Sequence, residues 1–124
     1  MTTSNPSYGK WPPDGAAGAV QCIGAAVQGN AGGPAMKAGV ITSGSHTGTG
    51  VYTFNLSTPI AVADLVVSAT ATYLQSGDAS LRTCVYVLEA GEGAFVDLIV
   101  FVFAFDGSLA DATQVSVAVF AAAT

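Results

Sequence analysis

The stretch FVDLIVFVFAFDG, Phe95 to Gly107, raises the question that decides the fold. A strand with one face in water alternates apolar and polar residues. Here Asp97 is the only polar residue between Phe95 and Phe105, so both faces consist of side chains that favour burial. A chain of 124 residues builds one core, which covers one of these faces. The other face needs a different cover.

The two faces of this expected strand separate by residue parity. Even positions are Val96, Leu98, Val100, Val102 and Ala104, and odd positions are Phe95, Asp97, Ile99, Phe101, Phe103 and Phe105. A wet face would forgo about 1.5–3 kcal/mol per side chain and would promote aggregation. We therefore predict a contact between copies of the chain, with the N-terminal arm folding back as the alternative cover. Because parity does not say which set faces inward, the interface candidates come from both: Val96, Leu98, Val100, Val102, Phe101 and Phe103.

The composition supports such a contact. Charged residues make up 9% of the chain, against about 25% in an ordinary globular protein, and apolar residues make up 51%. A soluble monomer normally keeps itself dispersed with charge. We therefore expect a largely neutral surface, part of which other subunits cover.

The net charge of −5 and the three scattered basic residues exclude two partner classes. Nucleic acids and anionic membrane surfaces both require clustered Lys and Arg. The longest apolar run, Leu98 to Phe105, has eight residues, whereas a spanning helix needs about 20. We predict neither a nucleic-acid nor a membrane partner.

Helix patterns are almost absent, and short runs rich in Thr, Val, Tyr and Phe alternate with turn residues. This pattern predicts an all-β protein, a jelly-roll-like antiparallel β-sandwich of about 7–8 strands. Seven strands are expected at Val20–Val27, Lys37–Thr42, Gly50–Leu56, Asp64–Thr72, Arg82–Glu89, Phe95–Phe105 and Gln114–Phe120.

Residues 1–19 hold three of the five prolines and lack periodicity, which predicts an extended N-terminal arm before a sandwich domain at 20–124. Its anchors would be Tyr8 and Trp11, followed by Pro12 and Pro13. The polar start lacks a secretory pattern, so we expect synthesis in a host cytoplasm. Cys22 and Cys84 are then expected as free thiols, with a bridge between them as the alternative.

The single histidine, His46, lies in SGSHTGTG, which reads as a loop. Ser45, His46 and Thr47 are candidates for a ligand-binding loop, and His46 could also be a metal ligand or a general base. We favour a solvated loop histidine, because no carboxylate or nucleophile motif lies nearby in sequence.

The acidic residues form no ligand cluster along the sequence. Asp106 and Asp111 flank Gly107, where their carboxylates would accept bonds from backbone N–H groups. Asp97 is expected to face solvent near the start of its strand, or else to pair with Arg82 or Lys37. No catalytic residues are assembled, so we predict no enzyme activity, no metal and no cofactor.

Two stretches resemble a known group: SGSHTGTGVYTFNL (Ser43–Leu56) and FVDLIVFVFAFDGSLADATQVSVAVF (Phe95–Phe120). They are similar to small jelly-roll modules of bacteriophage virions, both capsid decoration proteins and tail-fibre tips, which are themselves similar to tumour-necrosis-factor-like trimers. The resemblance implies a homotrimer with the apolar strand at its axis. No shaft, heptad or collagen repeat precedes the module, as it would in a fibre tip.

We therefore expect a structural protein on the virion exterior, a trimeric capsid decoration (cement) protein that stabilises the head. Its partners would be its own copies and the major capsid protein or another virion protein, with the arm as the latch. The first alternative is a receptor-binding tail-fibre or spike knob that attaches to the host through loops such as Ser43–Gly50 and Gln75–Ser80. The second is a secreted trimeric binding domain.

Overall fold

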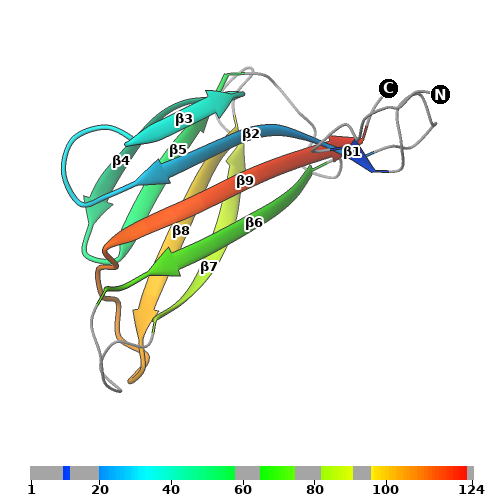
Figure 1. The fold of residues 1–124 in the computed structure, drawn as a ribbon. Coiled ribbons are helices and arrows are strands. Elements are labelled where there is room, and N and C mark those ends of the chain that lie inside the picture. Colours follow the sequence, from blue (N-terminus) through cyan, green and yellow to red (C-terminus); the bar gives the residue numbers. More distant parts are fainter. Residues whose placement is uncertain (1–9, 12–19, 58–64, 75–81, 91–95, 123–124) are drawn as a thin grey trace.

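The computed structural model describes residues 10–11, 20–57, 65–74, 82–90 and 96–122. Every regular element in these ranges is a β-strand, and no helix among them is long and apolar enough to cross a membrane. The strands form two antiparallel sheets that pack face to face (Figure 1). This arrangement confirms the predicted all-β sandwich.

The five-stranded sheet, here called sheet A, contains both the first and the last strand of the sandwich. Its long strands are β2 (Val20–Gln28), β9 (Gln114–Ala122) and β6 (Leu65–Thr72), in that order. Two short strands, β1 (Lys10–Trp11) and β3 (Met36–Gly39), pair with different parts of β2. The pairing of β2 with β9 brings the two ends of the sandwich domain side by side (Figure 1).

The four-stranded sheet, here called sheet B, carries the apolar segment. Its order is β4 (Ile41–Gly48), β5 (Val51–Leu56), β8 (Val96–Ala104) and β7 (Arg82–Ala90). The apolar strand β8 is therefore internal, with β5 on one side and β7 on the other.

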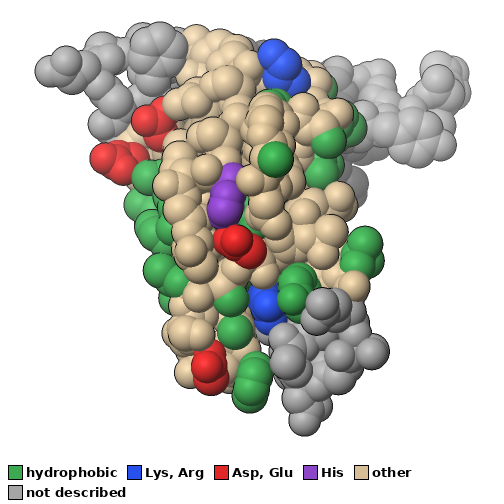
Figure 2. Space-filling view, turned by 90° about the vertical axis from the view of Figure 1, so that its left-hand side faces the viewer, with side chains coloured by type: hydrophobic (Ala, Val, Ile, Leu, Met, Phe, Trp, Pro, Cys, Tyr) green, Lys and Arg blue, Asp and Glu red, His purple; other side chains and the backbone are tan. Residues whose placement is uncertain are grey.

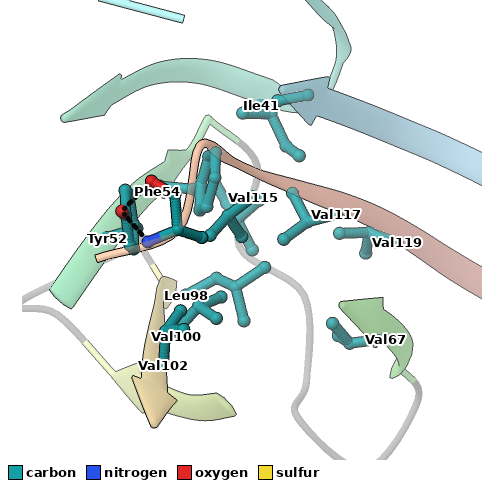
Figure 3. Packing of buried hydrophobic residues seen from close by; sticks show 13 residues of the cluster. Ile41, Tyr52, Phe54, Val67, Leu98, Val100, Val102, Val115, Val117 and Val119 are labelled. Atoms are coloured by element: carbon teal, nitrogen blue, oxygen red, sulfur yellow. Dashed lines mark hydrogen bonds between the residues drawn. The ribbon is translucent and has the colours of Figure 1, made fainter. Parts of the chain in front are cut away.

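The core lies between the sheets and follows the period of two in each strand. In β8 the residues Leu98, Val100 and Val102 have no exposed surface, and they face Val115 and Val119 of β9 across the core. Figure 3 shows these side chains pointing toward one another. The largest members of the cluster are Ile41, Tyr52, Phe54, Leu56 and Leu98.

This core corrects part of the predicted interface. Leu98, Val100 and Val102 were candidates for a contact between copies, but side chains with 0% exposure cannot touch a second chain. The reason is that the even set meets sheet A and fills the core. For Val96, a further candidate, the structure describes the strand position and not the side chain. Phe101 and Phe103 lie on the opposite face of the sheet.

The predicted strand at Lys37–Thr42 is wrong as a single element. The chain forms β3, leaves sheet A at Gly39 and Val40, and enters sheet B as β4. Gly39 has a positive φ of 65°, and a Cβ atom there would lie 1.9 Å from the carbonyl oxygen of Ile23. Only glycine fits this corner. The crossing between the sheets is therefore set by backbone geometry that hydrophobic periodicity does not report.

The finer jelly-roll prediction is not established. A jelly roll has eight strands arranged as two Greek keys, whereas sheet A has three long strands, β2, β9 and β6, and two short ones. The remaining predicted strands agree with the structure to within one or two residues at each end.

The predicted arm contributes one described segment. Lys10 pairs with Gln21, and Trp11 pairs with Val20, so β1 adds to the edge of sheet A at the start of β2. Tyr8, Pro12 and Pro13 lie outside the described residues, as does the proposed loop at 75–80.

Both thiols are free, as the sequence predicts. Cys22 pairs with Phe120, which places it on the outer face of sheet A, whereas Cys84 packs against the core from sheet B. Because sheet A stands between the two sulfur atoms, a bridge within one chain is not possible in this fold.

Candidate functional site

The outer face of sheet B carries a continuous apolar band. Phe101 of β8 lies between Val51 of β5 and Val85 of β7 in one row across the sheet. In the next row Ile99 has Val87 as its neighbour on β7, and at the far end Phe103 pairs with Leu109. We call these residues the outer band: Val51, Val85, Val87, Ile99, Phe101, Phe103 and Leu109.

The outer band is only partly covered within one chain. Val85 is 54% exposed and Val87 47% exposed, while the aromatic and isoleucine side chains of β8 are half-buried by their neighbours. Sheet A differs, since its outer face carries mostly small side chains, such as Ala25, Ser68, Thr70 and Ala118. Sheet A also has exposed apolar residues on this side, Val66 (60%) beside Phe120 and Met36 (49%) beside Val27, but sheet B has the row of adjacent large apolar side chains that crosses three strands.

A polar margin borders this band at the end where β8 begins. Ser43 donates to Asn55 Oδ1 at 2.5 Å, and Asn55 Nδ2 donates to Asp97 Oδ1 at 2.9 Å. Asp97 thus lies near the start of its strand on the outer face, as predicted, and its partner within the chain is Asn55 rather than Arg82. Pairing with Lys37 across an interface between copies stays a prediction. An apolar centre with a polar rim is the usual anatomy of a protein interface.

The predicted loop conformation of the candidate ligand-binding segment is wrong. Ser45, His46 and Thr47 belong to β4, which pairs with β5 through two register shifts. Glycine and serine are poor strand formers, but pairing with β5 overrides that preference. Ser45 points to the outer face, and Thr47 Oγ1 bonds Val51 O and Thr53 Oγ1 within the hairpin. This segment offers the framework of a strand and not an adaptable loop.

His46 is not a solvated loop residue, which corrects the interpretation favoured from the sequence. Its Nε2 lies 2.7 Å from Asp111 Oδ1, and its ring stands 4.9 Å from the ring of Tyr52. Its side chain is 19% exposed, against 40% for Asp111. Figure 2 shows the histidine in purple with a carboxylate beside it on the face in view. Asp111 was not found from the sequence because it lies 65 positions away.

The carboxylate of Asp111 fastens the connection between β8 and β9 to the β4–β5 hairpin. The same Oδ1 accepts from Gly50 N at 2.7 Å, while Arg82 Nε donates to the backbone carbonyl of Asp111 at 3.0 Å. Burial raises the pKa of Asp111, but the bonds from Gly50 and His46 and the charges of His46 and Arg82 lower it more. The pKa of this carboxyl therefore lies below its ordinary value. The predicted backbone bonds of Asp106 and Asp111 are confirmed, since Ser108 N donates to Asp106 Oδ1 at 3.0 Å.

A second group of hydrogen bonds lies next to the Asp111 bonds, on the side toward the core. The hydroxyl of Tyr52 donates to Asn30 Oδ1 and accepts from Ala112 N at 3.0 Å, and Asn30 Nδ2 donates to Ala112 O at 2.8 Å. The Tyr52–Ala112 contact is dashed in Figure 3. Burial is the main cause that raises the pKa of Tyr52. These bonds tie the start of β9 to sheet B, so the cluster has a clear structural task.

The chemistry of the cluster at His46 is limited by what surrounds it. A carboxylate that orients an imidazole is part of a catalytic triad, which also needs a nucleophile bonded to the ring. Among the described residues no hydroxyl or thiol donates to His46. Within the same ranges no three His, Cys, Asp or Glu side chains gather as metal ligands. The absence of enzyme activity, metal and cofactor stays a prediction.

No family model, curated protein or solved structure matches this chain. Its function is therefore argued from the outer band, in which large apolar side chains of three neighbouring strands lie side by side.

Proposed function

We propose that this protein is a self-associating structural protein whose copies contact one another through the outer band of sheet B. In keeping with the resemblance given above, we propose a homotrimer that decorates the exterior of a bacteriophage capsid. Its partners are its own copies and the major capsid protein or another virion protein.

The observation that carries the proposal is the row Val51–Phe101–Val85 across three neighbouring strands. These side chains are large, apolar and adjacent; Val85 is 54% exposed in one chain, while Val51 and Phe101 are partly buried. Contiguous apolar area of this kind on a soluble protein marks an interaction surface. Burying it against an identical surface removes the exposed area on every copy, provided that the assembly closes.

The low charge of the chain supports a role that depends on assembly. Only 9% of its residues are charged, so few charges need to lose water when copies meet, and interface centres are depleted in charge. A decoration protein acts by adding buried area between coat subunits, and it needs shape and apolar surface rather than reactive groups. We propose that the arm binds the capsid shell. Its strand β1 attaches the arm to the edge of sheet A by pairing with β2.

The alternative of a host-attachment knob rested on loops such as Ser43–Gly50, most of which is strand β4, and Gln75–Ser80, which lies outside the described residues. No feature of the described residues favours that function or the secreted binding domain over the virion role.

The association is tested with substitutions in the outer band. We expect sedimentation equilibrium of the purified chain to give three times its 12.3-kDa mass, or a multiple of that trimer mass. The double variant Ile99→Thr/Phe101→Thr should sediment as a smaller species. Ser45→Thr, an exposed change on the edge strand β4 of the same sheet, serves as the control. Leu109→Asp tests the same surface outside the strands, in case the double variant does not fold. A wild-type chain that stays monomeric at micromolar concentration contradicts the proposal.

The location is tested by imaging. An antibody against the chain should label the heads of phage particles in electron micrographs. Deleting residues 2–15 should abolish binding to purified capsids and leave the oligomer intact. Labelling confined to tail tips would replace the decoration role by host attachment, and unlabelled particles would contradict both.

A further inference from the structure

The two lateral sides of the sandwich are built differently. On one side β3 has four residues, and β4 has register shifts at Ile41/Ser43 and His46/Gly48. Lys37 Nζ also crosses from β3 to the carbonyl oxygen of Thr42 at 2.9 Å. Short strands, bulges and lysines are the devices by which proteins prevent edge strands from pairing with other chains. This side is protected.

The opposite side, formed by β6 and β7, lacks these devices. β7 pairs with β8 over nine residues in unbroken register, and its sequence RTCVYVLEA has no Lys, Pro or Gly. In the part of the chain that the structure describes, β8 is the only strand with which β7 pairs. Its outer line of backbone N–H and C=O groups is thus the edge of sheet B.

Apolar side chains are exposed on both faces of this edge. Val85 and Val87 belong to the outer face, and Tyr86 between them is 41% exposed on the inner side. The neighbouring edge strand β6 lies against β7 through the bond from Cys84 Sγ to Ala69 O at 3.3 Å, so sheet A borders the inner side of this edge. An extended strand added here would find backbone partners and apolar contacts above and below it.

We infer that the β7 edge is the site at which a second copy of this chain pairs its own β7, antiparallel and about a two-fold axis, to make one continuous eight-stranded sheet. The contact goes beyond the proposed function, because it uses the strand edge rather than the sheet face.

The sequence of β7 fits a copy of itself in one register. A two-fold axis perpendicular to the sheet keeps outer faces together, so paired residues have the same parity. With the axis at Tyr86, the tyrosine faces its own copy, Val85 faces Val87 twice, and Thr83 faces Glu89. Apolar side chains of matching type are then opposite one another, which is the favourable pattern for cross-strand pairs.

Charge decides between the two directions of pairing. β7 carries a positive residue at one end, Arg82, and a negative residue at the other, Glu89. Antiparallel copies place one charge of each sign at both ends of the joint, whereas parallel copies would bring like charges together. Like charges on neighbouring strands are destabilising. Charge therefore disfavours parallel copies, although Arg82 and Glu89 of antiparallel copies lie on opposite faces of the sheet and do not pair directly.

The direct test is a cysteine cross-link at the axis. In a chain carrying Cys22→Ser and Cys84→Ala, Tyr86→Cys should form a disulfide-linked dimer under mild oxidation, because directly opposite residues have Cα atoms about 4.5–5.5 Å apart. Glu89→Cys is the matched control. It lies six residues from its own copy in this register, about 20 Å along the strand, and should remain monomeric on a non-reducing gel.

A second variant measures the strength of the contact. Tyr86→Lys sets two lysines opposite each other, whereas Tyr86→Thr removes the ring without adding charge. We expect the lysine variant to weaken association about tenfold relative to the threonine variant, measured by sedimentation velocity. Equal association of the two variants, no dimer from Tyr86→Cys, or equal cross-linking of Glu89→Cys would each overturn the inference.

The outcome is separable from that of the proposed function. A Tyr86→Cys cross-link in a chain whose mass is unaffected by Ile99→Thr/Phe101→Thr would keep the edge contact and remove the face contact. The reverse pattern would remove the edge contact and keep the proposed trimer.

Discussion

Asp111 bonds three residues that are distant from it in the sequence. One carboxylate oxygen joins His46 and Gly50, and the backbone carbonyl of the same residue receives Arg82. These partners come from β4, the β4–β5 turn and β7, while Asp111 lies between β8 and β9. The bonds of Asp111 therefore hold three separate segments of sheet B to the connection that leads into sheet A.

Because the pKa of Asp111 is lowered, the stability that its bonds contribute depends on pH. A carboxyl with a depressed pKa in the folded state contributes stability above its unfolded pKa, about 3.9, and loses it as the pH falls through the folded pKa. Asp111→Asn should therefore be less stable than wild type at pH 7, and the gap should close toward pH 2. Because the side chain is 40% exposed, we expect about 1 kcal/mol or less. Urea unfolding at both pH values measures the gap, and a constant gap contradicts the prediction.

Gly50 is required for a second reason, which is its backbone conformation. Its φ is 70°, and a Cβ atom would lie 2.7 Å from Val102 O and 2.9 Å from Ala110 N. Gly50→Ala should cost about 2–4 kcal/mol of unfolding free energy, since steric overlap adds to the strain of a positive φ.

Gly107 provides the matched control for that substitution. Its φ is 86°, but a Cβ atom there has no neighbour within 4 Å among the atoms described. Gly107→Ala should therefore cost only the conformational term, about 1 kcal/mol. Equal losses in urea titrations of the two variants would show that contact with Val102 and Ala110 does not matter.

At the scale of the element, strand β8 has one face in the core and the other face on the outer surface of sheet B. Leu98 faces the core with no exposed surface, while the adjacent Ile99 faces outward between Thr53 and Val87. The strand therefore contributes to folding with its even residues and to the proposed assembly with its odd ones. This division accounts for the absence of polar alternation in the sequence.

Alanine substitution at these two neighbouring positions separates the two contributions. Leu98→Ala should destabilise the chain by about 2–5 kcal/mol, because it leaves a cavity in the core. Ile99→Ala should lower the free energy of unfolding clearly less, when unfolding is measured at a dilution at which the copies have dissociated. It should weaken self-association instead. A larger loss for Ile99→Ala than for Leu98→Ala at high dilution would contradict the face assignment.

The whole molecule is a sandwich in which each sheet separates an inner from an outer environment. Cys22 and Cys84 illustrate this, because one lies outside sheet A and the other packs inward from sheet B. Burial raises the pKa of the Cys84 thiol, so less of it is ionised than of an ordinary cysteine at neutral pH.

The thiols can be counted and timed with a thiol reagent. When the chain is unfolded in the absence of reductant, it should react with two equivalents of the thiol reagent, one for each cysteine. In the folded protein Cys84 should react more slowly than a free cysteine, because the thiolate is the reacting form. The single variants Cys22→Ser and Cys84→Ala assign each phase. No reactive thiol in the unfolded chain would mean that a disulfide had formed.

What the sequence determined by itself is the content of β-structure and the existence of a strand that is apolar on both faces. Period-two alternation and turn residues mark strands locally, and the run from Phe95 to Phe105 is apolar on both parities whatever it packs against. The bonds of Asp106 were also predictable, because its partner Ser108 is two residues away.

Only the tertiary structure decided which parity faces inward, that the segment around His46 is a strand, and that Asp111 is its partner. These features depend on strand order and on pairs up to 65 residues apart, which local patterns do not encode. The corner at Gly39 likewise depends on the nearby carbonyl of Ile23. Burial of one side of β8 against sheet A is what leaves its other side available for a partner.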